Sequence, residues 1–276
     1  MYRDILYTVE DPVAVITMNR PDALNAFTNR MLAEIRHALA AAERDERVVG
    51  IVLTGAGRGF CAGMDMNALN ALSSGGAGGA DDLSSLAATP GNPDMGDDFK
   101  IAFAYLLAIQ KPLLAAVNGA CAGLGFCFAL LCDMRFVDRN AKFSAAFSQR
   151  GLIAEHGVSW ILPRLVGPGR ALDILWSSRR FDGAEAEKLG IAERLCEPGT
   201  SLDEAKAYIR TLASSAAPVS LKVMKQQVYR HLNMPLGDSW KETIELMNES
   251  LVRSDFKEGV RSFMEKRPPK FPRVKG

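Results

Sequence analysis

The sequence has little histidine, no metal-type cysteine spacing and almost no net charge. Its three histidines are scattered, and its five cysteines show no Cys-x-x-Cys pair, so we expect no metal site. The net charge is only +1 and basic residues do not alternate with aromatic ones, so we expect no nucleic-acid partner. No apolar run approaches the ~20 residues that a membrane-spanning helix needs, so we expect no membrane span.

Composition otherwise resembles that of an ordinary globular chain. The 276 residues are 48% hydrophobic and 24% charged, which suits one large domain or a domain with a helical appendage. Most cysteines lie in apolar segments, as free buried thiols do in a reducing compartment. The first residues lack the apolar core of a signal peptide. We therefore expect a soluble, cytoplasmic protein.

Strand-like and helix-like segments alternate along the first 200 residues. Helical spacing is clear in Asn29–Arg44, for which Thr28 is a candidate N-cap. Strands are predicted at Ile5–Glu10, Val13–Met18, 48–53, Leu113–Val117 and 134–137. This alternation predicts an α/β domain whose sheets are covered by helices.

The C-terminal part reads differently, because it is almost wholly helical from Ser201 onward. We therefore divide the chain into a core at 1–200 and a helical region at 201–276. Two apolar stripes run along the predicted helices, and we interpret both as core packing. Their residues are Leu221, Met224 and Val228, and Trp240, Ile244, Met247 and Leu251.

Two glycine-bearing turns each follow an apolar strand and lead into a helix-like segment. They are residues 60–65, around Gly63, and residues 118–125, around Gly123. Such turns let a ligand approach the backbone, and helix N-termini present unpaired N–H groups. Two of them could direct N–H groups at one developing negative oxygen. The segment 55–60 is not a dinucleotide fingerprint, because Phe60 stands where its third glycine belongs.

Five motifs in order give the chain a resemblance to the crotonase family, the enoyl-CoA hydratases and isomerases. They are residues 20–26, 60–65, 118–125, 151–155 and 263–267. The resemblance implies an α/β fold with a ββα spiral core of acyl-CoA-binding type and a helical C-terminal trimerisation region. It also implies a homotrimer or homohexamer, a substrate carried as a coenzyme A thioester, and no prosthetic group.

The resemblance assigns the two turns a chemical role. A thioester carbonyl becomes an enolate when a proton leaves carbon 2, and two backbone N–H groups stabilise that oxygen. By the resemblance these donors are the N–H groups of Met64 and Leu124. Tight turns serving packing alone would account for the glycines but not for their pairing.

The acid–base residues depart from the hydratase pattern of the family. Its two glutamates fall at Cys127 and Phe147, which cannot transfer protons as carboxylates do. Glu155 instead resembles the single catalytic acid of the family's Δ3,Δ2-enoyl-CoA isomerases. We expect Leu152, Ile153 and Trp160 to enclose it in an apolar setting.

Other interpretations remain open at this stage. Glu155 could simply complement the dipole of the helix that follows it. Hydration, hydrolysis of a thioester or of a carbon–carbon bond, and catalytically silent acyl-CoA binding all remain alternatives.

Polar neighbours of the motifs receive smaller roles. His156 could tune Glu155 or act itself, although a histidine beside a helix start is more often structural. Asp65 and Asp133 are expected as caps or backbone anchors. Cys127 is expected as a packed thiol, not a nucleophile.

The resemblance also supplies the expected coenzyme A contacts. Ala23 and Leu24 lie near the nucleotide, Arg58 reaches a phosphate or is an ordinary surface cation, and Ala62 contacts the adenine. Phe263 and Lys266 reach the cofactor from a neighbouring subunit, and Arg267 has weaker support. The low-complexity segment 73–96 is expected as a flexible surface loop that borders the acyl pocket.

Overall fold

The computed structural model describes residues 2–66, 70 and 82–274. Its larger sheet is built from β1 (Ile5–Glu10), β2 (Val13–Met18), β3 (Gly50–Gly55), β5 (Leu113–Val117), β7 (Met134–Asp138) and β10 (Arg194–Cys196), in that spatial order. β1 and β2 form an antiparallel hairpin, and every other pair in this sheet is parallel.

A smaller sheet takes the strand that follows each of three parallel strands. Its order is β4 (Gly59–Cys61), β6 (Ala120–Ala122), β8 (Lys142–Ser144) and β9 (Phe181–Asp182). The chain thus passes from β3 to β4, from β5 to β6 and from β7 to β8, giving one strand to each sheet in every turn. The expected α/β fold with a ββα spiral core is confirmed.

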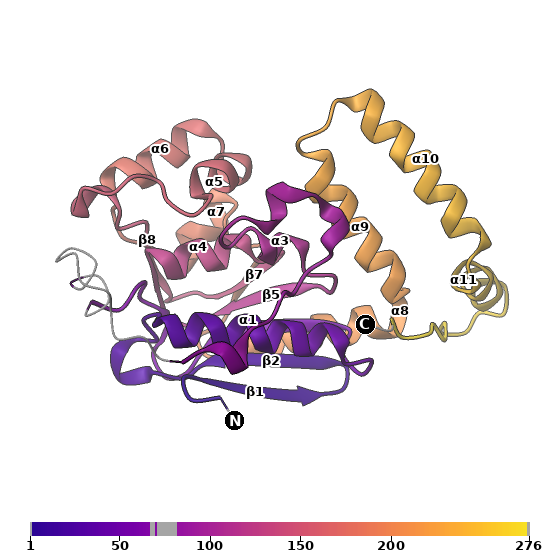
Figure 1. The fold of residues 1–276 in the computed structure, drawn as a ribbon, viewed down its shortest axis with the longest axis horizontal. Coiled ribbons are helices and arrows are strands. Elements are labelled where there is room, and N and C mark those ends of the chain that lie inside the picture. The colour runs from indigo at the N-terminus through magenta and orange to yellow at the C-terminus, as the bar shows by residue number, and fades with distance from the viewer. Residues whose placement is uncertain (1, 67–69, 71–81, 275–276) are drawn as a thin grey trace.

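Helices cover the sheets and extend beyond them (Figure 1). They are α1 (Asn29–Arg44), α3 (Tyr105–Ala108), α4 (Leu124–Leu131), α5 (Val158–Val166), α6 (Pro168–Ser177), α7 (Gly183–Leu189), α8 (Ser201–Ser215), α9 (Pro218–His231), α10 (Leu236–Val252) and α11 (Ser254–Met264).

The two faces of the larger sheet pack on different helices. Successive side chains of a strand point to opposite faces. Ile16 and Leu53 accordingly join the core cluster that contains the apolar side chains of α1. Val15 and Val52 join a second cluster with Ile209 of α8. Helix α8 therefore shares a core with the preceding residues, and the division at residue 200 stays a prediction.

Most element boundaries match the expectations, but one strand is shifted and β7 ends one residue later than predicted, at Asp138. β1, β2, β5 and α1 have the predicted bounds, and Met31 N donates to Thr28 Oγ1 at 3.0 Å as an N-cap requires. The strand predicted at 48–53 instead spans Gly50–Gly55, because its pairing with β2 begins at Val13 and Gly50. Val48 and Val49 are buried but lie outside the ladder.

The interpretation of the C-terminal stripes as core packing is confirmed for Leu221, which packs against the second core cluster, but within one chain it is wrong for the other stripe residues. Helices α10 and α11 stand away from the two sheets (Figure 1). Trp240 is 65% exposed, and most of the other stripe residues are also exposed: Met224, Val228, Ile244, Met247 and Leu251. Helical spacing establishes an apolar face, but it does not reveal what covers that face.

Only part of the predicted loop at 73–96 can be compared with the structure, because 73–81 lie outside the described residues. Short 3₁₀ turns occupy Ser84–Leu86 and Pro93–Met95. Met95 is only 5% exposed and belongs to the main core, so a purely surface loop is wrong at that residue.

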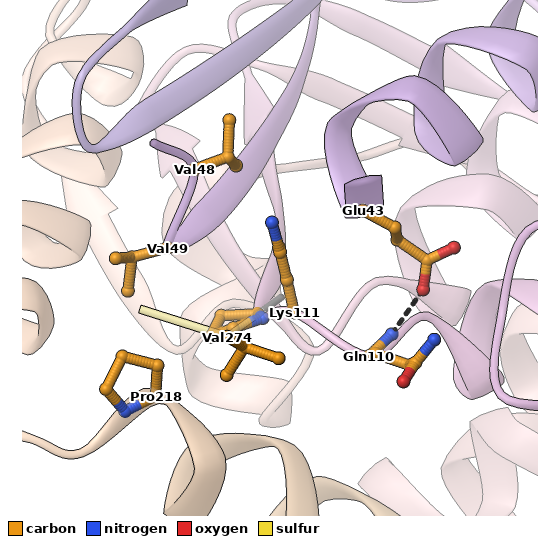
Figure 2. Close-up of a pocket in the computed structure, with 8 residues that line it drawn as sticks. Glu43, Val48, Val49, Gln110, Lys111, Pro218 and Val274 are labelled. Atoms are coloured by element: carbon orange, nitrogen blue, oxygen red, sulfur yellow. Dashed lines mark hydrogen bonds between the residues drawn. The ribbon is translucent and has the colours of Figure 1, made fainter. Parts of the chain in front are cut away.

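A buried lysine just before β5 forms hydrogen bonds with the C-terminal end of α1. Lys111 is 6% exposed, and its Nζ donates to the carbonyls of Ala42 at 2.9 Å and Asp45 at 2.8 Å. Beside it, Glu43 accepts a hydrogen bond from the backbone of Gln110 at 2.7 Å (Figure 2). The adjoining pocket, of about 20 Å³, has room for a water molecule but not for a substrate.

Two further observations concern the cysteines and the search for membrane-spanning helices. All five cysteines are free and buried. Within residues 2–66, 70 and 82–274, none of the helices combines the length and apolar content needed to cross a membrane.

Candidate active site

The two glycine turns lie side by side because the strands before them are neighbours. β4 and β6 pair in parallel, with Gly59 opposite Ala120 and Cys61 opposite Cys121. The turns that follow therefore leave the small sheet on the same side. A Cβ at Gly63 would lie 3.6 Å from the backbone nitrogen of Leu124. The structure thus brings the two predicted motifs together.

Glycine is required for this close approach. A Cβ at Gly125 would lie 2.2 Å from the carbonyl oxygen of Cys61, and Gly63 has a φ of +109°. Both conditions exclude an ordinary side chain. The turns can approach each other only because these two positions carry none.

The backbone amides of Met64 and Leu124 are held in place, and their N–H groups are not used in hydrogen bonds within the described residues. Phe27 accepts from Asp65 N at 2.9 Å and donates to the carbonyl of Gly63 at 2.7 Å, so it fixes both neighbours of Met64. Leu124 is the first residue of α4, where backbone N–H groups have no partner within the helix. Among the described residues, neither amide has a hydrogen-bond acceptor.

The motif at residues 20–26 anchors the first turn. Arg20 pairs with Asp65 at 2.9 Å and donates to the carbonyl of Ala26 at 2.6 Å. Asn25 Nδ2 donates to the carbonyls of Ala56 at 2.9 Å and Gly59 at 2.7 Å. The ion pair between Arg20 and Asp65 was not predicted. The sequence did contain a signal for it, because Arg20 begins one recognised motif and the oppositely charged Asp65 ends another.

The second turn is anchored in a similar way. Asn118 Nδ2 donates to the carbonyls of Gly55 and Gly57, both at 2.9 Å, and so joins the β5–β6 connection to the β3–β4 connection. Asp133 is a backbone anchor as expected, because it accepts from Leu113 N at 2.7 Å.

Three of the expected coenzyme A contacts lie together beside the first turn. Ala62 N donates to the carbonyl of Leu24 at 3.0 Å, and Ala23 immediately precedes Leu24 in a 3₁₀ turn. Arg58 is exposed in the connection from β3 to β4. Their roles in binding stay predictions.

Glu155 and His156 lie in the segment between a 3₁₀ turn at Ser148–Arg150 and the start of α5. Glu155 Oε2 is 3.8 Å from His156 Nε2, and each side chain is 34% exposed. His156 has a φ of +54°, and the centre of its ring is 5.1 Å from that of Phe103. Phe103 was missed, because a single aromatic residue in a connecting segment carries no sequence signal.

The apolar enclosure expected around Glu155 is only partly present. Trp160 packs against the main core, but Leu152 is 40% exposed and Ile153 is 79% exposed. The expectation was therefore wrong for these two side chains. A run of apolar residues before a helix does not determine whether their side chains point into the protein or toward solvent.

Glu155 lies within electrostatic range of α4, the helix that begins at Leu124. Burial raises the pKa of the Cys127 thiol to about 12, and the Glu155 carboxylate adds to that rise. The thiol donates to the carbonyl of Gly123 at 3.2 Å. Cys127 is thus a packed thiol as expected. Contacts also connect the Glu155 segment to α4, because His156 lies against Phe103 and the Phe103 ring centre is 5.0 Å from that of Phe128.

Phe263 and Lys266 are not brought to this site within one chain. Helix α11 lies at the right edge of the molecule, well away from α4 in its body (Figure 1). Phe263 is 85% exposed at the end of α11, and Lys266 follows that helix. Their expected approach from a neighbouring subunit stays a prediction.

Comparison with known proteins agrees with the geometry. A 1,2-epoxyphenylacetyl-CoA isomerase of Escherichia coli is 34% identical over 98% of this chain and 99% of its own length. A short-chain-enoyl-CoA hydratase of Clostridium acetobutylicum is 30% identical over 96% of this chain and 95% of its own length. The crystal structure of an enoyl-CoA hydratase from Polaromonas sp. JS666 has a TM-score of 0.83 at 27% identity, covering 97% of this chain and 99% of that one.

The family model described as enoyl-CoA hydratase/isomerase matches residues 8–273, which is nearly the whole chain. The order of the motifs, the ββα spiral and the paired glycine turns agree with this match. The protein is therefore an enzyme of the enoyl-CoA hydratase/isomerase, or crotonase, family.

Proposed function

We propose that this enzyme shifts the double bond of an enoyl-CoA, with Glu155 as the single acid/base. The observation that carries the proposal is the chain of contacts that runs from Glu155 through His156 and Phe103 to Phe128 of α4. The two hydratase glutamate positions hold Cys127 and Phe147. Cys127 is a buried, hydrogen-bonded thiol and Phe147 is a core side chain. Neither can activate water.

The proposed reaction balances within one substrate. Glu155 takes a proton from carbon 2 of a 3-enoyl thioester, and the electron pair delocalises onto the carbonyl oxygen. The N–H groups of Met64 and Leu124 stabilise that enolate oxygen. Glu155 then returns the proton to carbon 4, which leaves the double bond between carbons 2 and 3. No water is consumed and no prosthetic group is required.

Relatives of both kinds fit chemistry that passes through a thioester enolate. The Escherichia coli relative is named an isomerase and the Clostridium acetobutylicum relative a hydratase. Enoyl-CoA hydration is the alternative that the hydratase name favours. It would require Glu155 or His156 to activate water without the two usual glutamates. A catalytically silent acyl-CoA binder is the second alternative, supported by the loss of both glutamates.

We also propose a homotrimer or homohexamer in which a neighbour's Phe263 and Lys266 complete the coenzyme A site. The exposed apolar faces of α9 and α10 support assembly, since an apolar patch of this kind marks an interface. Light scattering coupled to size exclusion tests this, and a monomer at micromolar concentration would contradict it.

The five free thiols support a cytoplasmic location.

The experiment that tests the reaction compares two substrates on one preparation. With trans-3-enoyl-CoA thioesters of several lengths, ultraviolet absorbance should rise as the conjugated thioester forms. With trans-2-enoyl-CoA, absorbance should not fall to the 3-hydroxyacyl product. A flat trace on the first substrate and a fall on the second would replace isomerisation with hydration. Flat traces on both, with coenzyme A binding intact, would favour the silent binder.

A further inference from the structure

A row of four rings connects the first glycine turn to the segment that carries Glu155. The ring centres are 4.6 Å apart between Phe27 and Phe128, 5.0 Å between Phe128 and Phe103, and 5.1 Å between Phe103 and His156. These distances lie in the range of roughly 4.5–7 Å in which aromatic rings attract each other. We call these four residues the aromatic row.

One end of the aromatic row is fixed to both N–H donors. The backbone of Phe27 bonds both neighbours of Met64, and Phe128 lies one helical turn after Leu124 in α4. Phe27 and Phe128 are both fully buried, so neither ring can leave the other without opening the core. The row therefore begins at the two groups that stabilise the enolate oxygen in the proposed reaction.

The other end of the aromatic row lies against the Glu155 carboxylate. The backbone carbonyl of Glu155 accepts from Val158 N at 3.0 Å, which fixes the main chain at the start of α5. The carboxylate is 34% exposed, and in the described part of the chain His156 is the one basic side chain that contacts it. Their separation of 3.8 Å is too long for a hydrogen bond, so His156 limits the movement of the carboxylate by packing.

The backbone on both sides of the contact between Phe103 and His156 is strained. Ala102, which precedes Phe103, has a φ of +42°, and His156 has a φ of +54°. Left-handed conformations of residues other than glycine persist where surrounding contacts enforce them, and they are common at functional sites. The strain indicates that the fold keeps these two rings together against a local preference of the chain.

We propose that Phe103 is a positioning residue, which sets the distance between the Glu155 carboxylate and the two N–H donors. It does so by packing between Phe128 of α4 and His156, the neighbour of Glu155. A glutamate side chain has several rotatable bonds, and a displacement of about 1 Å at a reacting group can cost roughly 100-fold in rate. This role rests on the proposed function of Glu155 and adds what holds that side chain in place.

The test combines crystal structures with steady-state kinetics of the full-length wild type and of Phe103→Leu. The substitution removes the ring contacts, so the Glu155 carboxylate should move or occupy several conformers. On a trans-3-enoyl-CoA, kcat should fall by about 10- to 100-fold while KM stays within about twofold, because geometry at the reacting atoms is lost and not ground-state binding.

Two control variants separate the ring contact from the general loss of an aromatic side chain. Phe103→Tyr keeps the ring and should retain both the Glu155 position and kcat within about threefold. Phe99→Leu removes a ring from the same connecting segment, but Phe99 is only 8% exposed and packs in the main core. It should lower the unfolding temperature and leave kcat within about twofold of wild type.

The two readouts distinguish failure of the positioning role from failure of the proposed reaction. A displaced carboxylate together with a lower kcat, in Phe103→Leu alone, supports the role. An unmoved carboxylate overturns it, whether or not the enzyme isomerises the substrate. In an active enzyme, an unchanged kcat in Phe103→Leu or an equal loss in either control also overturns it. If the wild type is inactive but the carboxylate is displaced in Phe103→Leu, the contact does position Glu155 and isomerisation is the proposal that fails.

Discussion

Gly63 and the backbone nitrogen of Leu124 face each other across the two glycine turns, and a Cβ on Gly63 would lie 3.6 Å from that nitrogen. The same Cβ would lie 3.2 Å from the carbonyl oxygen of Ala122. This contact relates the spacing of the two N–H donors to the absence of a single methyl group. The proposed oxyanion site is therefore sensitive to substitution at a residue with no side chain.

Gly63→Ala should separate the two donors and lower turnover. Losing one such donor typically costs about 100- to 1,000-fold in kcat. Steady-state kinetics on a 3-enoyl-CoA would measure the loss. Gly96→Ala is a matched control, because Gly96 also has a positive φ, of +102°, but no atom lies within 4 Å of its Cβ position. Equal losses in both variants would mean that backbone strain, not donor spacing, is responsible.

Cys127→Ala should leave kcat within about twofold of wild type. The thiol is buried, and burial together with Glu155 raises its pKa to about 12, so almost none is ionised at neutral pH. Losing the packed sulfur should cost about 1 kcal/mol of unfolding free energy. Chemical denaturation and turnover can be measured on the same sample. Loss of turnover in a folded variant would make the thiol part of the reaction.

Ser201→Ala should stabilise the protein by about 1 kcal/mol. It removes a buried hydroxyl that has no partner among the described residues, and a buried unpaired hydroxyl is costly. Ser178→Ala is the contrasting control, since Ser178 is equally buried but its hydroxyl bonds Ser148 Oγ at 2.9 Å. Thermal unfolding should move in opposite directions for the two variants. Destabilisation by both would show that Ser201 has a partner in solution.

Lys111 should make stability depend on pH in the alkaline range. Burial lowers the pKa of Lys111 from 10.5 to about 8, although Asp45 and Glu43 favour its charged form. Between about pH 8 and pH 10.5 the unfolded chain therefore holds the Lys111 proton more often than the folded chain. The contribution of this residue to stability rises with pH across that window.

The pH dependence is best measured as a difference from Lys111→Met. This variant keeps the aliphatic bulk and removes the titrating group, so the effects of neighbours such as Arg273 largely cancel. Urea unfolding of both proteins from pH 7 to 10.5 should show the wild type gaining relative to the variant. A constant difference would contradict the lowered pKa.

The sequence predicted the local elements well where pattern and pairing coincide. Thr28 and the apolar spacing after it specify α1, alternation specifies β1, and a nearly continuous apolar run specifies β2. The strand at Gly50 was misplaced by two residues, because Val48 and Val49 are apolar and buried but pair with no neighbouring strand. Burial can be inferred from residue type, whereas register depends on the neighbouring strand.

Motif order predicted that the two glycine turns act together, and the structure places these turns side by side. The roles of Glu155 and of the two N–H groups stay predictions, and the surroundings of the turns were not predicted. The exposure of Ile153, the contact of Phe103 with His156 and the unpartnered Ser201 hydroxyl depend on how distant segments meet. No local sequence pattern predicts such tertiary contacts.

The initial rate of trans-3-enoyl-CoA isomerisation by wild type and Glu155→Gln tests the central claim most directly. Glutamine keeps the size and polarity of the side chain but cannot carry the proton. The variant should lose turnover by at least about 100-fold, as general acid–base catalysts do, while coenzyme A binds with unchanged affinity. Wild-type turnover that survives in Glu155→Gln would contradict the account and assign the proton transfer to another residue.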